Sequence, residues 1–283
     1  MSQPVLSIGI KCHRDIRIFK TLSSIDLDNV DVIVALTPHA ALERRLSALK
    51  CRVVIVPVGS LSVSSEACIN NAICDKIVLT DSDTSFGPGY LKKMLELLNC
   101  YDVVKGKFIE DHSPFVIGSK LVSNYREYVH NIERPMFMPG LAINRQIAAS
   151  IGGYIFNTNL TRGSDYDFAL RVKANNIRTY IEQSVFIRHE PENILHDLVS
   201  AWITGTSTYN LNTIEPIPDG KWFTLCRSLL TILGIGRFQH YWYVLKEKGF
   251  FTAVYHHLWT SVFLIGYNWV KLKRISLSLN SKQ

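Results

Sequence analysis

The sequence of 283 residues lacks the patterns that mark several large protein classes. Its six cysteines form no C-x-x-C pair and have no histidines at zinc-ligand spacing, so neither a zinc site nor a disulfide framework is predicted. No G-x-G-x-x-G or G-x-x-x-x-G-K loop follows the first apolar run, which argues against a dinucleotide dehydrogenase and a P-loop NTPase. The start has no basic n-region, unlike a secretory signal. A reducing, cytoplasmic location is therefore expected.

Charged residues are scarce, at 19% of the chain, whereas hydrophobic residues make up 47%, so the chain is expected to bury a core. The charge is uneven. Residues 221–283 hold nine lysines and arginines against one glutamate, a net charge of +8, and residues 1–220 carry −1. This split favours an anionic surface as a partner and argues against nucleic acid. We therefore expect a domain at 1–220 and a basic, aromatic-rich helical tail at 221–283.

Short apolar runs alternate with helix-like segments through the first two thirds of the chain. Strands are predicted at residues 5–10, 30–36, 52–56, 76–80 and 103–108, and helices at 16–25, 38–49, 63–73 and 88–98. The alternation predicts a Rossmann-like, mostly parallel α/β sheet flanked by helices. Ligands of such sheets bind beyond the carboxyl ends of the strands, so the residues that follow each run are the first candidates for a site.

Two carboxylates follow the fourth predicted strand directly, Asp81 and Asp83. Side chains two apart in an extended segment point the same way, so both can face one ligand. Two hard oxygen donors suit Mg²⁺ or Mn²⁺ shared with the phosphates of a nucleotide. The alternative is a simple turn, because Asp and Ser are common turn residues.

A second candidate carboxylate lies at a predicted helix start. Ser164 and Asp167 have the spacing of a capping box, which predicts a helix from Ser164 to about Ala174 with Asp167 engaged in capping. Asp165 then stands on another face of the first turn and can project into a cleft. The alternative role for Asp165 is to complement the positive helix end, an effect of about 0.5 kcal/mol.

These segments, in their order along the chain, resemble a family 2 glycosyltransferase of GT-A fold over roughly residues 4–190. The resemblance rests on Val5-Leu6-Ser7-Ile8, Asp81-Ser82-Asp83, Ile151-Gly152-Gly153-Tyr154 and Gly163-Ser164-Asp165-Tyr166-Asp167-Phe168 with Arg171. It implies an inverting, metal-dependent transfer of a sugar from a nucleotide-sugar to an acceptor hydroxyl. In that family the residue matching Asp83 holds Mn²⁺ or Mg²⁺ on the diphosphate, Asp81 sits near the ribose or sugar, and Asp165 is the general base.

The resemblance also implies roles for four further residues. His189 contacts the metal or the diphosphate, Asn70 lies near the donor, and Gly140 and Leu141 line the sugar and acceptor pocket. For a lone histidine such as His189, a structural role is the alternative.

Three positions depart from the family pattern. Thr37 lies in the stretch where an acidic residue usually reads the base, Glu66 replaces an arginine near the phosphates, and Ser164 replaces the acidic residue before the base. The departures leave the base of the donor open and point to a divergent donor or to lost activity. Two other functions are considered: a non-catalytic nucleotide-sugar or glycan binding module on the same fold, and a sugar-phosphate nucleotidylyltransferase, for which Lys11-Cys12-His13-Arg14-Asp15 is no phosphate loop.

The tail contains an uncharged stretch, residues 249–270, which as a helix is about 33 Å long. Its apolar residues form one stripe and basic residues flank both ends, which favours a helix in the membrane interface over a span. The stripe consists of Phe251, Val254, Tyr255, Leu258, Val262, Ile265 and Trp269. Further tail helices are expected at 222–233 and 238–245.

Membrane contact would suit a lipid-linked or glycan acceptor, in surface polysaccharide or glycolipid assembly at the inner face of a membrane. The alternative is that the helix at 249–270 packs on the domain or on a second subunit in a homo-oligomer.

Overall fold

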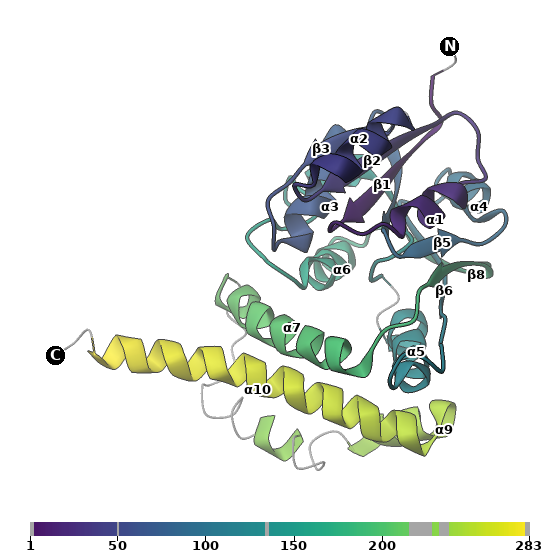
Figure 1. The fold of residues 1–283 in the computed structure, drawn as a ribbon. Helices are drawn as coiled ribbons and strands as arrows, with labels where there is room; N and C mark the ends of the chain where they lie inside the picture. The colour runs from purple at the N-terminus through teal and green to yellow at the C-terminus, as the bar shows by residue number, and fades with distance from the viewer. Residues whose placement is uncertain (1–2, 50, 134–135, 215–227, 232–237, 281–283) are drawn as a thin grey trace. The chain divides into compact units, whose positions relative to one another are not determined.

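A computed structural model describes residues 3–49, 51–133, 136–214, 228–231 and 238–280. The chain divides into two compact units (Figure 1). Unit 1 comprises Met1–Glu110 and Val129–Glu190, and unit 2 comprises Asp111–Tyr128 and Pro191–Gln283. The boundary expected after residue 220 falls in 215–227, outside the described residues.

Unit 1 is built on an eight-stranded sheet of order β3-β2-β1-β4-β7-β6-β8-β5. The strands are β1 (Leu6–Cys12), β2 (Val30–Leu36), β3 (Arg52–Ile55), β4 (Lys76–Asp81), β5 (Thr84–Phe86), β6 (Val103–Glu110), β7 (Leu141–Asn144) and β8 (Thr179–His189). Strands β3, β2, β1 and β4 pair in parallel, as do β6 and β8, whereas β7 and β5 pair antiparallel to their neighbours. The predicted mostly parallel α/β sheet is confirmed.

The helices of unit 1 connect these strands. They are α1 (Ile18–Ser23), α2 (Ala40–Ala48), α3 (Leu61–Asn71), α4 (Tyr90–Leu97), α6 (Ser164–Ala174), and the short η1 (Val129–Glu133) and η2 (Arg145–Ser150). Each of the helices predicted up to residue 98 is present, although α1 is shorter than expected. The predicted span of α6 agrees with the structure at both ends.

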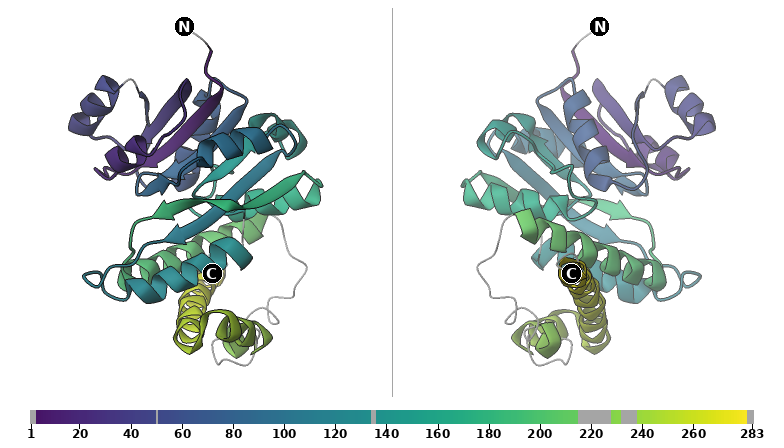
Figure 2. Two further views of the ribbon diagram at one scale, coloured as in Figure 1. Left: turned by 90° about the vertical axis from the view of Figure 1, so that its right-hand side faces the viewer. Right: turned by 90° about the vertical axis from the view of Figure 1, so that its left-hand side faces the viewer.

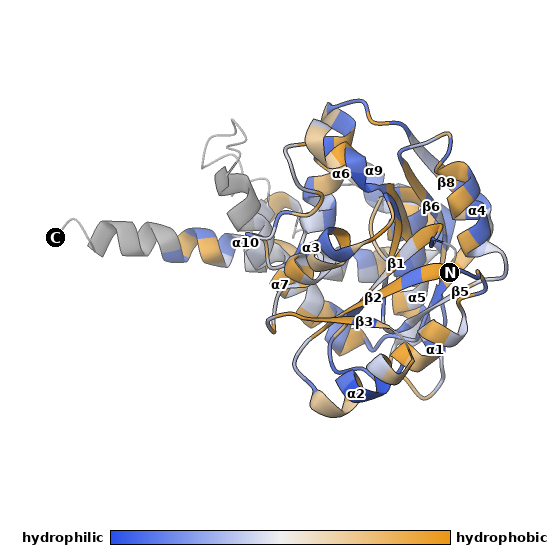
Figure 3. Ribbon diagram, turned by 90° about the horizontal axis from the view of Figure 1, so that it is seen from above, coloured by the Kyte–Doolittle hydropathy of each residue, from blue (hydrophilic) through white to orange (hydrophobic). Residues whose placement is uncertain are grey.

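Two apolar cores cover the two faces of this sheet, because successive side chains of a strand point to opposite faces. On one face Ile8 and Val78 pack with residues of α1, α2 and α4. On the other face Ile77 and Leu79 pack with residues of α3, η2 and α6. Figure 3 colours much of β1 and β2 as hydrophobic, as expected for central strands buried on both faces.

Unit 2 is helical, with α5 (Ser119–Tyr128), α7 (Ile194–Ile214), α9 (Phe238–Lys248) and α10 (Phe250–Asn280). Helices α7 and α10 lie side by side in Figure 1, and Figure 2 views α10 nearly along its axis. Glycines allow this close approach: a Cβ at Gly205 would lie 2.1 Å from the Phe263 carbonyl oxygen, and one at Gly266 would lie 2.7 Å from that of Trp202. The expected helix at 238–245 is α9, whereas most of 222–233 lies outside the described residues.

The helix predicted at 249–270 is the first part of α10. Of its expected stripe, Tyr255 is buried, whereas Phe251, Val254, Leu258, Ile265 and Trp269 are exposed. Among the described residues, no helix combines the length and the hydropathy that a membrane span needs.

Candidate functional site

Strand register brings three segments of unit 1 to one edge of the sheet. In the parallel pair of β1 and β4, Lys11 lies opposite Asp81, so the segments that follow both strands leave the sheet side by side. In the pair of β5 and β8, Thr84 lies opposite His189. The end of β8 is also tied to the aspartate turn, because the Glu190 backbone N–H donates to the Asp83 carbonyl oxygen at 3.0 Å.

The two aspartates of the turn contact different cations. An Asp81 carboxylate oxygen lies 2.8 Å from Nζ of Lys11, whose side chain is only 6% exposed. Asp83 lies between two groups: one oxygen is 3.4 Å from an Arg17 guanidinium nitrogen and the other is 3.5 Å from Nε2 of His189. The structure therefore brings Asp81, Asp83 and His189 together, as the resemblance implied.

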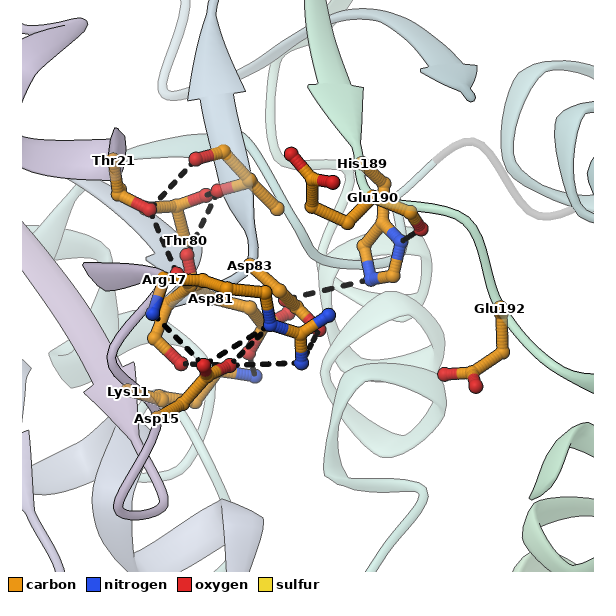
Figure 4. Close-up of polar contacts among 12 residues, drawn as sticks. Lys11, Asp15, Arg17, Thr21, Thr80, Asp81, Asp83, His189, Glu190 and Glu192 are labelled. Carbon is orange, nitrogen blue, oxygen red and sulfur yellow. Dashed lines mark hydrogen bonds and ion pairs between the residues drawn. The ribbon is translucent and has the colours of Figure 1, made fainter. Parts of the chain in front are cut away.

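A third carboxylate, Asp15, joins this site from the segment after β1. It accepts hydrogen bonds from the backbone N–H and from Nε of Arg17, and its Oδ2 is 3.3 Å from the Ser82 hydroxyl. Figure 4 shows the Arg17 side chain between Asp15 and Asp83. The guanidinium thus holds carboxylates of two loops together.

The hydrogen bonds of His189 determine what its second nitrogen can do. Nδ1 lies 2.7 Å from the Glu190 carbonyl oxygen, which can only accept, so Nδ1 carries a proton. In a neutral ring Nε2 then carries a lone pair, and this atom lies 3.5 Å from the Asp83 carboxylate. Two ligands on one ion at about 2.1 Å each lie about 3.0 to 3.5 Å apart. The pair of Asp83 and His189 therefore fits a divalent cation.

Helix α6 presents Asp165 in its first turn, where the half-buried carboxylate accepts from the Tyr166 backbone N–H at 3.0 Å. The capping-box prediction is wrong: the N-cap residue is Gly163, with a φ of 81°, and no side chain caps the helix. Asp167 is instead paired with Arg171, at 2.6 Å.

The pairing of Arg171 explains why the Gly-Gly-Tyr segment accompanies this helix. The Arg171 guanidinium also donates to the carbonyl oxygens of Ile151, Tyr154 and Ile155 and lies 4.3 Å from the ring centre of Tyr154. Asp167 and Arg171 thus fix the loop that leads into α6, and with it the position of Asp165.

Gly140 and Leu141 lie at the start of β7, next to the aspartate strand. The Gly140 N–H donates to the Leu79 carbonyl oxygen at 2.8 Å, and its own carbonyl accepts from the Tyr90 hydroxyl. A Cβ at Gly140 would lie 2.7 Å from that hydroxyl and its φ is +79°, so glycine is required here. The Leu141 side chain is fully buried in the core.

Asn70 is not brought to this site. It is exposed near the end of α3, where the next carbonyl, that of Asn71, accepts from Arg52 at the start of β3. This is the amino edge of the parallel strands, opposite the aspartates. Two of the departing residues are buried. The Thr37 hydroxyl has no hydrogen-bond partner among the described residues, whereas Glu66 accepts from the Phe156 N–H at 2.7 Å, and burial raises the pKa of Glu66.

Lys105, on β6, is a buried cation near the candidate base. Its side chain is 1% exposed, and its amine donates to the Phe137 carbonyl oxygen and lies 3.4 Å from Nδ1 of His130. Burial lowers the pKa of Lys105 to about 7, and the charge of Asp165 opposes that shift.

Sequence reasoning passed over Lys11, Asp15, Arg17 and Lys105. The first three flank the end of the first predicted strand, which is itself a signal, since strand ends are where ligands bind. For Lys105 the signal is weak, because the predicted strand at 103–108 contains two lysines and the sequence does not say which one is buried.

Comparisons with known proteins bear on the fold. No family model and no curated protein matches the sequence. Among solved structures, the chain is similar to the crystal structure of S. aureus TarS, with a TM-score of 0.51 and 14% sequence identity. The match covers 70% of this chain and 39% of that one. The fold is glycosyltransferase-like.

Proposed function

We propose that the protein is a metal-dependent, inverting glycosyltransferase that moves a sugar from a nucleotide-sugar to an acceptor hydroxyl. The observation that carries the proposal is the pair of Asp83 and His189, with ligand atoms 3.5 Å apart, at the carboxyl edge of a glycosyltransferase-like sheet. Asp81 and Asp83 bind the donor and its metal, and Asp165 on α6 is a separate carboxylate for the acceptor. The base and the sugar of the donor are left open.

The reaction is a single displacement at the anomeric carbon. The acceptor oxygen forms a bond to that carbon while the bond to the diphosphate oxygen breaks, and the Asp165 carboxylate takes the acceptor proton. A Mn²⁺ or Mg²⁺ ion held by Asp83 and His189 would neutralise the charge of the diphosphate. Arg17 and Lys11 supply positive charge beside the same phosphates, and the rigid sheet holds these groups in line.

The acceptor is proposed to be a glycan or a lipid-linked sugar used in surface polysaccharide or glycolipid assembly. The basic C-terminal helices would then place the enzyme on the cytoplasmic face of a membrane. Self-association into a homo-oligomer stays a prediction.

One observation favours a second candidate, a non-catalytic nucleotide-sugar binding module. Arg17 contacts both Asp15 and Asp83, and Lys11 contacts Asp81, so each carboxylate has a cation beside it without any metal. A module that only binds could keep these pairs. Nothing specific favours the nucleotidylyltransferase.

The test is thermal stabilisation by a panel of nucleoside diphosphates and nucleotide-sugars, each with and without Mn²⁺. A ligand that binds only the folded state raises its stability, by about 2.7 kcal/mol at a hundred times its Kd. We expect a Mn²⁺-dependent shift for one nucleotide that is lost in Asp83→Ala. The matched control is Asp75→Asn, because Asp75 precedes β4 at the opposite end from Asp81 and is half exposed.

Either of two results would contradict the proposed donor site: no nucleotide stabilises the protein, or the Mn²⁺-dependent stabilisation persists in Asp83→Ala. If a nucleotide raises the melting temperature equally with and without Mn²⁺, nucleotide binding is supported and metal dependence is contradicted.

A further inference from the structure

The longest helix of unit 2 buries polar side chains and exposes apolar ones. Along α10 the side chains of Thr252, His256, Thr260 and Asn268 are buried, whereas apolar side chains on the same helix face outward. The exposed apolar residues of α10 are Phe250, Phe251, Val254, Leu258, Ile265, Trp269 and Leu272. A helix that packs on a water-soluble core shows the opposite arrangement.

Helix α7 repeats this pattern, because it buries Asp197 and Ser207 and exposes Leu195 and Val199. Contacts between α7 and α10 pass through glycines and polar groups. Small residues at helix contacts and polar groups turned inward are features of helices whose outer face meets lipid.

The loop before α5 adds two exposed apolar side chains, Phe115 at 94% and Ile117 at 69%. It lies beside the start of α10, and the two segments share a groove of about 810 Å³. Ile117, Phe250 and Phe251 line this groove, and Phe115 belongs to the same loop as Ile117. We call these four exposed side chains the apolar rim. A monomer surrounded by water rarely gathers such side chains without a partner.

Basic residues next to the apolar rim indicate the partner. Lys120 of α5 and Lys248 of α9 line the groove itself, and Lys246 lies two residues before Lys248. The acidic residues beside them are Glu247 and Glu127, the latter 3.5 Å from Lys248. A second copy that met this rim by two-fold symmetry would bring like lysines together, whereas anionic lipid headgroups would pair with them.

We propose that the apolar rim inserts into the acyl layer of an anionic membrane, with the adjacent lysines at the level of the lipid phosphates. This deepens the proposed membrane contact of the C-terminal helices and rests on it. It extends that contact to the loop at 112–118, far away in sequence, and makes the insertion shallow, because the side chains enter from a loop tip and a helix end.

The experiment is flotation of the full-length protein with vesicles of phosphatidylcholine, with and without phosphatidylglycerol. We expect binding to the anionic vesicles, reduced at least about tenfold in the double variant Phe115→Ser/Ile117→Ser, because neither serine side chain gains free energy by leaving water for the acyl layer. The control is Ile16→Ser, which removes an equally exposed apolar residue, at 71%, from unit 1. It should bind like the wild type.

A second readout places the loop directly. Tryptophan fluorescence of Phe115→Trp should be quenched by lipids with brominated acyl chains more than that of the wild type, which has five tryptophans of its own. Equal quenching, or equal flotation of the double variant and the wild type, would overturn the proposal. So would a dimer that the double variant dissociates, because the rim would then join two copies.

Failure of this proposal can be told from failure of the donor site. Nucleotide stabilisation is measured on the same variants, and it should be unchanged in Phe115→Ser/Ile117→Ser. If the double variant floats like the wild type while nucleotides still stabilise both proteins, the membrane contact is contradicted and the donor site is not.

Discussion

Units 1 and 2 bury different mixtures of side chains. In unit 1 aliphatic and aromatic side chains cover both faces of the sheet, with a few charged groups such as Lys105 and Glu66 buried beside them. In unit 2, buried side chains include a carboxylate, hydroxyls and an imidazole, while Phe and Trp side chains point outward. The difference teaches that burial alone does not predict which residues a helix turns inward, and it is the observation behind the membrane contact proposed for unit 2.

The largest expected effect concerns the polar interior of unit 2. Asp197 is buried and links three helices: it is 3.2 Å from Nε of Arg126 on α5 and accepts from the Tyr255 hydroxyl of α10 at 2.7 Å. We expect Asp197→Ala to lower the free energy of unfolding by about 2 to 4 kcal/mol, because it removes a buried carboxylate that pairs with Arg126 and accepts from Tyr255. Urea unfolding measures it.

Tyr255→Phe is the matched control for Asp197, since it removes a single hydroxyl from the same network. It should cost about 1 kcal/mol. If Asp197→Ala lowered the free energy of unfolding no more than Tyr255→Phe, the buried polar contacts would not be what stabilises unit 2. The contrast drawn between the two units would then be wrong.

A pH-dependent effect concerns Lys105, the buried cation of unit 1, whose amine lies 3.4 Å from Nδ1 of His130. Its pKa is about 7 in the folded protein against 10.5 for the free side chain. The unfolded chain therefore binds more protons between these values, and the free energy of unfolding rises with pH across that window, by at most about 1.4 kcal/mol per pH unit. Lys105→Met removes this contribution.

Unfolding curves of the wild type and Lys105→Met at several pH values measure the difference, since titrations of other groups are common to both. The difference should change between pH 7 and 10. A constant difference would mean that Lys105 stays charged in the folded state.

The smallest expected effect on stability concerns Arg17, at the edge of the sheet that carries the aspartates. The Arg17 side chain is 47% exposed, so Arg17→Gln should change the free energy of unfolding by no more than about 0.5 kcal/mol. Its guanidinium competes with a cation at Asp83, so the affinity for Mn²⁺ should rise about fivefold, as expected for a Coulomb energy near 1 kcal/mol. Titration calorimetry measures that affinity, and an unchanged value would place the metal elsewhere.

The sequence predicted most of the sheet of unit 1, because buried parallel strands are short apolar runs and the helices between them are periodic. It also placed Asp81 and Asp83 at a strand end and Asp165 in the first turn of α6. It did not predict the partner of Asp167, because a side chain three residues into a helix can cap the helix start or pair with Arg171 one turn on, and only the fold decides which.

The sequence predicted the packing of unit 2 less well than that of unit 1. The apolar stripe of α10 was visible, but helical periodicity does not say which face packs on protein. That Tyr255 is buried while Val254 is exposed depends on contacts with α5 and α7, which are distant in sequence. The loop at 112–118 carried no signal, since single apolar residues in loops are common.

The most direct test of glycosyl transfer in unit 1 is Asp165→Asn, assayed with the nucleotide-sugar that stabilises the wild type. Release of nucleoside diphosphate and affinity for the donor are measured on the same preparation. The account predicts that release falls by about 10² to 10⁴, because the acceptor proton has no base, while the donor Kd stays unchanged. Release at the wild-type rate would contradict it.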